Sequence, residues 1–81
     1  MEKVVGKFDK SDTGCINVEF KETGGKTFLD IRKMYKKKDM TDYAMTKKGI
    51  FIPVNKLYAL RKAINKAIKM AEKAGLLKGE E

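Results

Sequence analysis

One stretch of the sequence decides the predicted fold: Gly24-Gly25-Lys26-Thr27-Phe28-Leu29-Asp30-Ile31-Arg32-Lys33-Met34-Tyr35-Lys36-Lys37-Lys38. It begins with two glycines, continues through aliphatic and aromatic residues, and ends in a tyrosine followed by three lysines. Glycine accepts the positive φ angles of a tight turn, while β-branched and aromatic side chains favour a strand. The stretch therefore predicts a turn followed by a strand over about residues 26–36.

The two faces of this strand would differ in chemistry, because successive side chains of a strand point to opposite faces. One face would carry Thr27, Leu29, Ile31, Lys33 and Tyr35. The other would carry Lys26, Phe28, Asp30, Arg32 and Met34. This second face mixes cations with an aromatic ring, as surfaces that bind single-stranded nucleic acid do. Phe28 and Tyr35 would share a face only if a bulge shifted the strand before Tyr35.

The rest of the chain predicts an α+β fold, a curved four-stranded antiparallel sheet followed by one long C-terminal helix. Ile16, Val18 and Phe20 alternate with more polar residues, which is the period of a half-buried strand. Turn-forming residues over 9–14 predict a hairpin connection. Within a single domain covering residues 1–81, the strands are expected over about 4–8, 15–21, 26–36 and 48–53.

The C-terminal part predicts a helix and, through its length, a dimer. Apolar residues recur at three- and four-residue steps, which indicates a helix over about 55–75, with Asn55 as candidate N-cap and Gly75 as candidate C′ residue. A helix of about 20 residues spans roughly 30 Å, more than a four-stranded sheet needs. The excess favours a homodimer in which the apolar stripe continues onto a second copy. The polar residues 36–46 predict a long loop.

Composition narrows the possible functions. The 81 residues include 19 basic and 11 acidic side chains, a net charge of +8. This balance favours a polyanion such as nucleic acid, with an anionic membrane surface or a passive basic surface as alternatives. The chain has no histidine and one cysteine, so we expect no intrachain disulfide, zinc finger or histidine-based acid–base catalysis. No enzyme activity, metal or cofactor is therefore expected.

Cysteine usage and hydropathy give an expected location. A single cysteine fits a reducing compartment, and no run of about 18 apolar residues is present to cross a bilayer. We therefore expect a cytoplasmic protein, associated with the nucleoid if it is bacterial.

The candidate binding residues are cations and aromatic rings in or beside the expected sheet. Several of these residues could instead have a purely structural role. Phe28 could pack against the helix, Tyr35 could cap the core at the end of its strand, and the lysines after Tyr35 could be a solvated cluster. The predicted nucleic-acid-binding set is Lys26, Phe28, Arg32, Tyr35, Lys36, Lys37, Lys38, Lys47 and Lys48.

The segment from Gly25 to Tyr35 resembles the central strand of the positive cofactor four transcriptional coactivators. It has the Gly-Lys start, the Asp-Ile-Arg core and the aromatic end of that family. Lys47-Lys48-Gly49-Ile50 resembles the motif that opens the last strand of the family, and Leu57 and Leu60 fall where the family helix has apolar anchors. The resemblance covers roughly Ile16 to Ile68 and is to the compact bacterial members.

The resemblance implies a homodimer that binds single-stranded DNA across its sheets, with low sequence selectivity, in transcription, replication or repair. DNA is favoured over RNA, and transcription or repair proteins would be further partners. Lys26, Arg32 and Lys48 would contact phosphates, and Tyr35 would stack on bases. The chain departs from the family at Thr23, where relatives carry an aromatic residue, and at Tyr35, where they carry tryptophan. The stacking residue missing at Thr23 is either lost or replaced by Phe20 or Phe28, and Tyr35 is a smaller platform than tryptophan. The two departures imply a lower affinity per site.

Two other functions stay open from the sequence. The first keeps nucleic-acid binding but takes RNA or duplex DNA as its ligand. The second is a protein–protein adaptor whose long amphipathic helix, with a lysine-rich polar face, docks an acidic partner.

Overall fold

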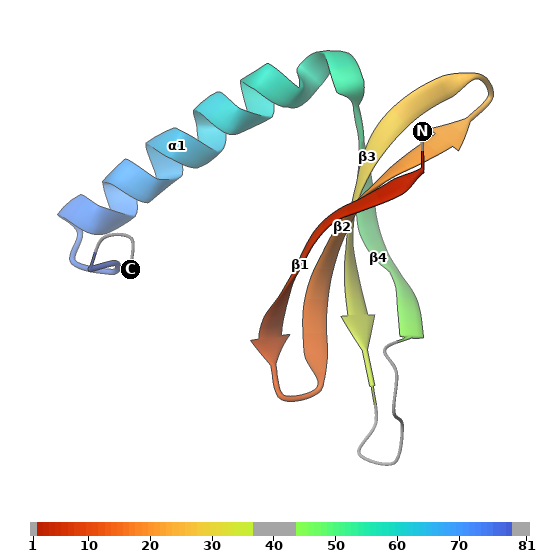
Figure 1. Ribbon diagram of the computed structural model, residues 1–81. Helices are drawn as coiled ribbons and strands as arrows, with labels where there is room; N and C mark the ends of the chain where they lie inside the picture. Colours follow the sequence, from red (N-terminus) through yellow and green to blue (C-terminus); the bar gives the residue numbers. More distant parts are fainter. Residues whose placement is uncertain (1, 37–43, 79–81) are drawn as a thin grey trace.

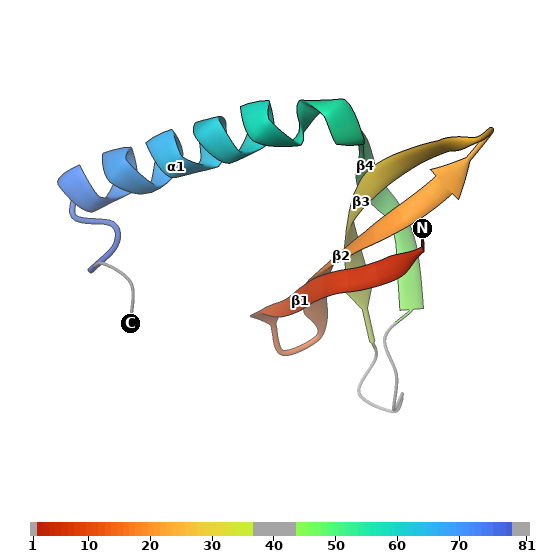
Figure 2. The same ribbon diagram turned by 45° about the horizontal axis from the view of Figure 1, so that its top comes forward.

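The computed structural model describes residues 2–36 and 44–78. Its four strands form one antiparallel sheet in sequence order, and a single helix follows, which confirms the predicted fold class. Figures 1 and 2 show strongly twisted strands and a helix that leaves the sheet beyond the end of β4. The elements are β1 (Lys3–Ser11), β2 (Gly14–Thr23), β3 (Lys26–Tyr35), β4 (Ala44–Pro53), the short 3-10 helix η1 (Val54–Lys56) and α1 (Leu57–Lys73).

The β2–β3 hairpin is the centre of the sheet. Its pairing runs without a register shift from Thr23–Lys26 at the turn to Gly14–Tyr35 at the far end. Gly24 and Gly25 form the turn with φ of 57° and 75°. A two-residue type I′ hairpin turn requires positive φ at both central positions. The predicted glycine turn is therefore confirmed, and the continuous ladder excludes a bulge on β3 before Tyr35.

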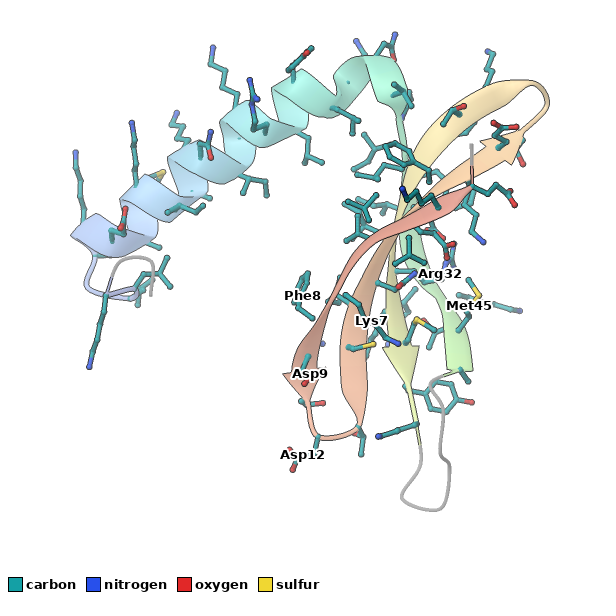
Figure 3. All side chains as sticks on the ribbon, viewed as in Figure 1. Lys7, Phe8, Asp9, Asp12, Arg32 and Met45 are labelled. Carbon is teal, nitrogen blue, oxygen red and sulfur yellow. The ribbon has the colours of Figure 1, made fainter. Side chains whose placement is uncertain are left out.

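Strand register divides the side chains between two faces of the sheet. Figure 3 shows this division, with Phe8 projecting from one side of the sheet and Arg32 and Met45 from the other. The Arg32 face carries Asn17, Glu19, Lys26, Phe28, Asp30, Arg32 and Phe51. The apolar face carries Phe8, Ile16, Val18, Phe20, Leu29, Ile31, Ile50 and Ile52.

The first strand is longer than its sequence predicts. Residues 9–14 are rich in turn formers, but β1 continues to Ser11, which pairs with Gly14. A register shift at Lys10 lets the strand absorb an extra residue. Only Asp12 and Thr13 remain between the strands. The expected end of the strand at residue 8 is therefore wrong, because pairing with β2 overrides the local turn preference.

The fourth strand also begins earlier than expected. The predicted loop over 36–46 and the predicted strand start at residue 48 are both wrong at this end, because β4 begins at Ala44. Ala44 and Met45 pair with the last residues of β3, and a register shift then separates them from Gly49. Residues 37–43 lie outside the described residues. Among the described strands, β4 lies at the edge of the sheet with β3 as its neighbour. A strand at a sheet edge can be polar, so the sequence of this segment lacks the apolar pattern by which a strand is predicted.

The helix begins later than predicted and ends as predicted. Asn55 lies inside η1, and the N-cap of α1 is Lys56, which makes no side-chain capping hydrogen bond. Gly75 has a φ of 76° and donates its N–H to Glu72 O at 3.1 Å, while Leu76 donates to the carbonyl five residues earlier at 2.8 Å. This pair of bonds is a Schellman motif, which confirms Gly75 as the C′ residue. Within the described residues, no helix is both long and apolar enough to cross a bilayer.

Little apolar surface is buried in one copy of the chain. Among the described residues, the buried apolar side chains are Cys15 and Leu29. The helix extends away from the sheet (Figures 1 and 2) and buries none of its residues. Ile64 and Ile68 in its apolar stripe are 51% and 44% exposed, and Ile50 on the apolar face is 58% exposed. The stripe and the apolar face are therefore two uncovered hydrophobic surfaces.

The hairpin turn gives a test of the β2–β3 register. We expect Gly24→Ala to lower the free energy of unfolding by about 1–2 kcal/mol, the cost of a left-handed conformation for an L-residue. A Cβ at Gly24 meets no atom within 4 Å, so this cost is conformational and not steric. Gly24→Asn is the matched control, because asparagine is accepted in type I′ turns. Equal stability of the two variants in urea denaturation would contradict the turn assignment.

Candidate nucleic-acid interface

Arg32 is held in a defined position at the centre of its face. Its Nε donates to Asp30 Oδ2 at 3.1 Å, and its Nη1 donates to the Thr46 carbonyl oxygen at 2.7 Å. The guanidinium carbon also lies 5.7 Å from the centroid of the Phe51 ring, within the range of a cation–π contact. The guanidinium is thus fixed at two nitrogens and keeps further N–H donors for a ligand.

Asp30 is the buried part of this arrangement. Its side chain is 1% exposed, whereas that of Arg32 is 17% exposed. Removing a carboxylate from water is costly, and the paired cation offsets only part of that penalty. The second oxygen, Oδ1, has no hydrogen-bond partner among the described residues. We interpret Asp30 as a residue that orients Arg32 and not as a net source of stability.

Gly49 leaves the space that Arg32 occupies. The two residues are cross-strand partners on β3 and β4. A Cβ on Gly49 would lie 3.0 Å from Arg32 Cζ, 3.1 Å from the Ile31 carbonyl oxygen and 3.2 Å from Arg32 Cα. Two of these atoms belong to the backbone, so they cannot move aside as the end of a side chain could. The glycine of the Lys-Gly-Ile motif is therefore explained by the close approach of Arg32.

Two phenylalanines and a lysine continue the Arg32 face toward the helix. The rings of Phe28 and Phe51 lie 5.9 Å apart between centroids, tilted by 32°. Phe28 also lines a hollow of about 530 Å³, a volume typical of small-ligand sites. Lys26 lies at the start of β3 and Lys56 at the end of η1, and both line the same hollow with Asn55. The hollow thus combines an aromatic wall with two cations.

The structure does not place all the predicted binding residues on one surface. Lys26, Phe28 and Arg32 share the Arg32 face. Tyr35 points to the opposite face, where it is 40% exposed. Lys48 lies near Lys33, which also belongs to that opposite side. Phe28 lies beside the Phe51 ring of β4 and lines a hollow with residues of η1.

Two of the remaining predicted lysines, Lys36 and Lys47, lie at the end of the sheet away from the helix. Lys36 follows β3 and donates its backbone N–H to the Thr13 carbonyl oxygen at 2.9 Å. Lys47 is exposed on β4. Lys37 and Lys38 lie outside the described residues, so their predicted role stays a prediction.

Sequence reasoning missed the contribution of β4 to the Arg32 face. Phe51 and the Thr46 carbonyl oxygen both contact the Arg32 guanidinium. Phe51 lies between Ile50 and Ile52 in the predicted strand, so strand alternation predicts that its side chain points to the face opposite theirs. The contact between the Thr46 carbonyl oxygen and Arg32 could not be predicted, because residue 46 belonged to the predicted loop.

The sequence profile of the family described as "Transcriptional Coactivator p15 (PC4)" matches residues 10–63. This match spans more than half of the chain. The chain belongs to the PC4 family. The membership confirms the identification made from the Gly-Lys, Asp-Ile-Arg and Lys-Gly-Ile motifs, and it includes every element from the end of β1 to the first half of α1.

Solved structures of PC4 homologues share the fold. The PC4 homolog BPSL1147 from Burkholderia pseudomallei superimposes with a TM-score of 0.74 at 24% identity, covering 82% of this chain and 88% of that chain. A second crystal form of BPSL1147 gives a TM-score of 0.71, covering 83% and 97%. A bacteriophage T5 homolog, described as implicated in recombination-dependent DNA replication, gives 0.55 at 15% identity over 98% of both chains. A comparison with curated proteins finds no significant match.

These likenesses agree with the family membership and show that the chain has the fold of PC4 homologues. At such identities the structural matches establish the shared fold. The roles of Lys26, Phe28 and Arg32 therefore depend on the geometry of this chain.

The close approach of Gly49 and Arg32 gives a test of the PC4 site geometry. We expect Gly49→Ala to lower the free energy of unfolding by about 1–3 kcal/mol, as overpacking at a site without free space does. Gly6→Ala is the matched control, since Gly6 also lies in a strand but a Cβ there meets no atom within 4 Å. Both are measured by urea denaturation. A Gly49→Ala variant as stable as Gly6→Ala would show that this contact does not fix Arg32.

Proposed function

We propose that this protein is a homodimeric, non-enzymatic binder of single-stranded nucleic acid, with DNA favoured over RNA and low sequence selectivity. The observation that carries the proposal is the Arg32 face, where a fixed guanidinium adjoins two aromatic rings in a chain of the PC4 family. The T5 relative is implicated in DNA replication. We place the cellular role of this chain in transcription, replication or repair.

Arg32 supplies the phosphate contact in this proposal. A guanidinium presents N–H donors in a planar fork that matches a phosphate group. Asp30 and Thr46 hold two of its nitrogens, so less conformational freedom is lost when a phosphate binds. Lys26 adds an exposed charge at the start of β3. Such contacts read the backbone and carry no base information, which accounts for low sequence selectivity.

Phe28 and Phe51 supply the stacking surface. Every base has a π-face, so stacking on an aromatic ring tolerates any sequence and contributes about 1–3 kcal/mol per base. Phe51 is 47% exposed and Phe28 is half-buried beside it. A base stacked there would lie between the Arg32 guanidinium and the hollow lined by Lys26. Paired bases in a duplex are already stacked on each other, so this arrangement favours a single strand.

A second copy of the chain would cover the uncovered apolar surfaces. A domain of about 60–80 residues is marginal when it buries little apolar area, and one copy buries few apolar side chains among its described residues. The apolar stripe of α1 and the apolar face are both available for this contact. The Arg32 face lies on the other side of the sheet, so dimerisation through these surfaces leaves it open.

Binding to an oligonucleotide of dT tests the function directly. We expect the logarithm of the affinity to fall linearly with the logarithm of salt concentration, at about 0.7 for each phosphate contacted. Fluorescence anisotropy titrations with dT, rU and duplex DNA rank the three ligands. Equally weak binding of dT and duplex at low salt would contradict the proposal. Tighter binding of rU or duplex would favour the RNA or duplex alternative.

Single substitutions test the Arg32 face. We expect Phe28→Ala to weaken dT binding by about 5- to 150-fold, the loss of one stacked base. Arg32→Ala should also weaken binding, whereas Arg61→Ala, which removes the same charge from α1, should not. Because Arg32→Ala leaves Asp30 without its partner, Lys26→Gln repeats the test at an exposed position. Equal effects of Arg32→Ala and Arg61→Ala would place the binding surface elsewhere.

The mass in solution tests the dimer. We expect light scattering to give twice the chain mass, and Ile64→Lys to reduce it to one chain by placing a charge in the apolar stripe. Asn65→Lys adds the same charge on the polar side of α1, where Asn65 lies beside Arg61 and Lys62, and it should leave the dimer intact. A monomer that does not bind dT would instead support the adaptor alternative, in which the helix docks an acidic protein.

A further inference from the structure

Three sulfur-containing side chains lie next to one another on three adjacent strands. Cys15 of β2 is directly opposite Met34 of β3, and Met34 is directly opposite Met45 of β4. Directly opposite residues of an antiparallel pair share a face, with Cβ atoms about 4.5–5.5 Å apart. We call Cys15, Met34 and Met45 the sulfur row. It lies on the same side of the sheet as Arg32, and Figure 3 shows Met45 projecting from that side.

Burial decreases along the sulfur row from β2 to β4. Cys15 is a free cysteine that is 0% exposed, Met34 is half-buried, and Met45 is 52% exposed. The Cys15 thiol makes no hydrogen bond with the described residues. The row therefore joins an enclosed sulfur without a partner to a sulfur that solvent reaches.

One thiolate and two thioethers form a ligand set for a soft cation. Thiolate and thioether sulfurs select Cu(I) among the biological metals. A methionine side chain has three rotatable bonds, so the two thioethers can turn toward an ion held by Cys15. Zinc is bound by cysteine, histidine and carboxylate side chains, and the described residues contain no group of three of these that could hold a metal. The row therefore favours Cu(I) over zinc.

The charge of Cu(I) also suits this position. Cu(I) bound to one thiolate is a neutral unit, whereas a net charge is costly to bury. Arg32 precedes Met34 by two residues on the same strand face, and its charge would repel a divalent ion about twice as strongly as a monovalent one. Asp9 of β1 is exposed and directly opposite Cys15, so its carboxylate offsets part of that repulsion.

We propose that the sulfur row is a Cu(I) site whose three ligands are the Cys15 thiolate and the thioethers of Met34 and Met45. A copper–sulfur bond replaces the S–H bond of Cys15, the proton passes to solvent, and the ion stays Cu(I). The exposed Met45 is the point of entry. The spacing of the three residues in the sequence does not predict this site, because only the pairing of three strands brings them together. The site does not depend on the proposed function.

The test is an anaerobic titration in which the protein competes for Cu(I) with the coloured chelator bicinchoninate. We expect the unmodified protein to take up one Cu(I) per chain. Met34→Leu and Met45→Leu conserve side-chain volume, and each should weaken binding by about tenfold or more, since even the loss of a group that only orients a metal ligand costs about 10–100-fold. Met70→Leu is the matched control, because Met70 is exposed on α1, and it should bind Cu(I) as the unmodified protein does.

Two further measurements identify the ligands. Cys15→Ser removes the thiolate and should abolish the uptake of Cu(I), and its thermal unfolding without copper shows whether the variant is folded. X-ray absorption of the copper-loaded, unmodified protein needs no substitution and should show three sulfur neighbours around the ion. Cu(I) should also raise the unfolding midpoint of the unmodified protein, because the site exists only in the folded chain.

Several results would overturn the proposal. Binding by Met34→Leu and Met45→Leu that is as tight as that of the unmodified protein would reduce the site to a cysteine alone. An equal loss in Met70→Leu and Met34→Leu, or undiminished binding by Cys15→Ser, would place the copper elsewhere. One Cu(I) for every two chains would indicate an ion bridging two copies, and no uptake against the chelator would exclude the site.

Discussion

The uninterrupted pairing of β2 with β3 is the constraint on which the rest of the structure depends. A shift of one residue would move every side chain of β3 to the other face. The glycine turn fixes the register at one end, and the ladder keeps it over all ten residues of β3. Arg32 and Asp30 therefore share a face with Phe28, while Leu29 shares the other with its apolar neighbours. The location of the Arg32 face follows from this one hairpin.

The outer strands β1 and β4 contain register shifts, whereas the central hairpin does not. Register shifts in β1 and β4 add residues without disturbing β2 or β3, as bulges at sheet edges commonly do. The shift in β4 brings Thr46 next to Arg32 on one side and next to Lys33 on the other. Gly49 then keeps the backbone of β4 close to the guanidinium. The site is thus formed by the regularly paired β2–β3 hairpin and by β4, whose pairing is shifted.

The two faces of the sheet carry charges in different environments. On the Arg32 face, the buried Asp30 is paired with a cation that stays partly exposed, an arrangement that specifies geometry more than it stabilises the fold. On the other side, lysines repel one another beside uncovered apolar side chains. Neither the buried ion pair nor the repulsion between lysines stabilises the isolated chain. Both features are explained if a second copy stabilises the fold and a bound polyanion stabilises the charges.

The sequence by itself determined the central hairpin, the four-strand-and-helix order, the Gly75 helix end and the family, because each rests on local signals such as glycine turns, alternation and a recognisable motif. It also identified Lys26, Phe28 and Arg32 as one group, since strand parity is a local property. Strand parity already places Tyr35 on the face opposite Arg32, and the structure decided that no bulge on β3 changes this. Only the tertiary structure decided that Lys48 lies on the opposite side, and that Thr46, Gly49 and Phe51 surround Arg32. These relations depend on how β4 pairs with β3 across a register shift, and pairing between segments distant in sequence leaves no local pattern to read.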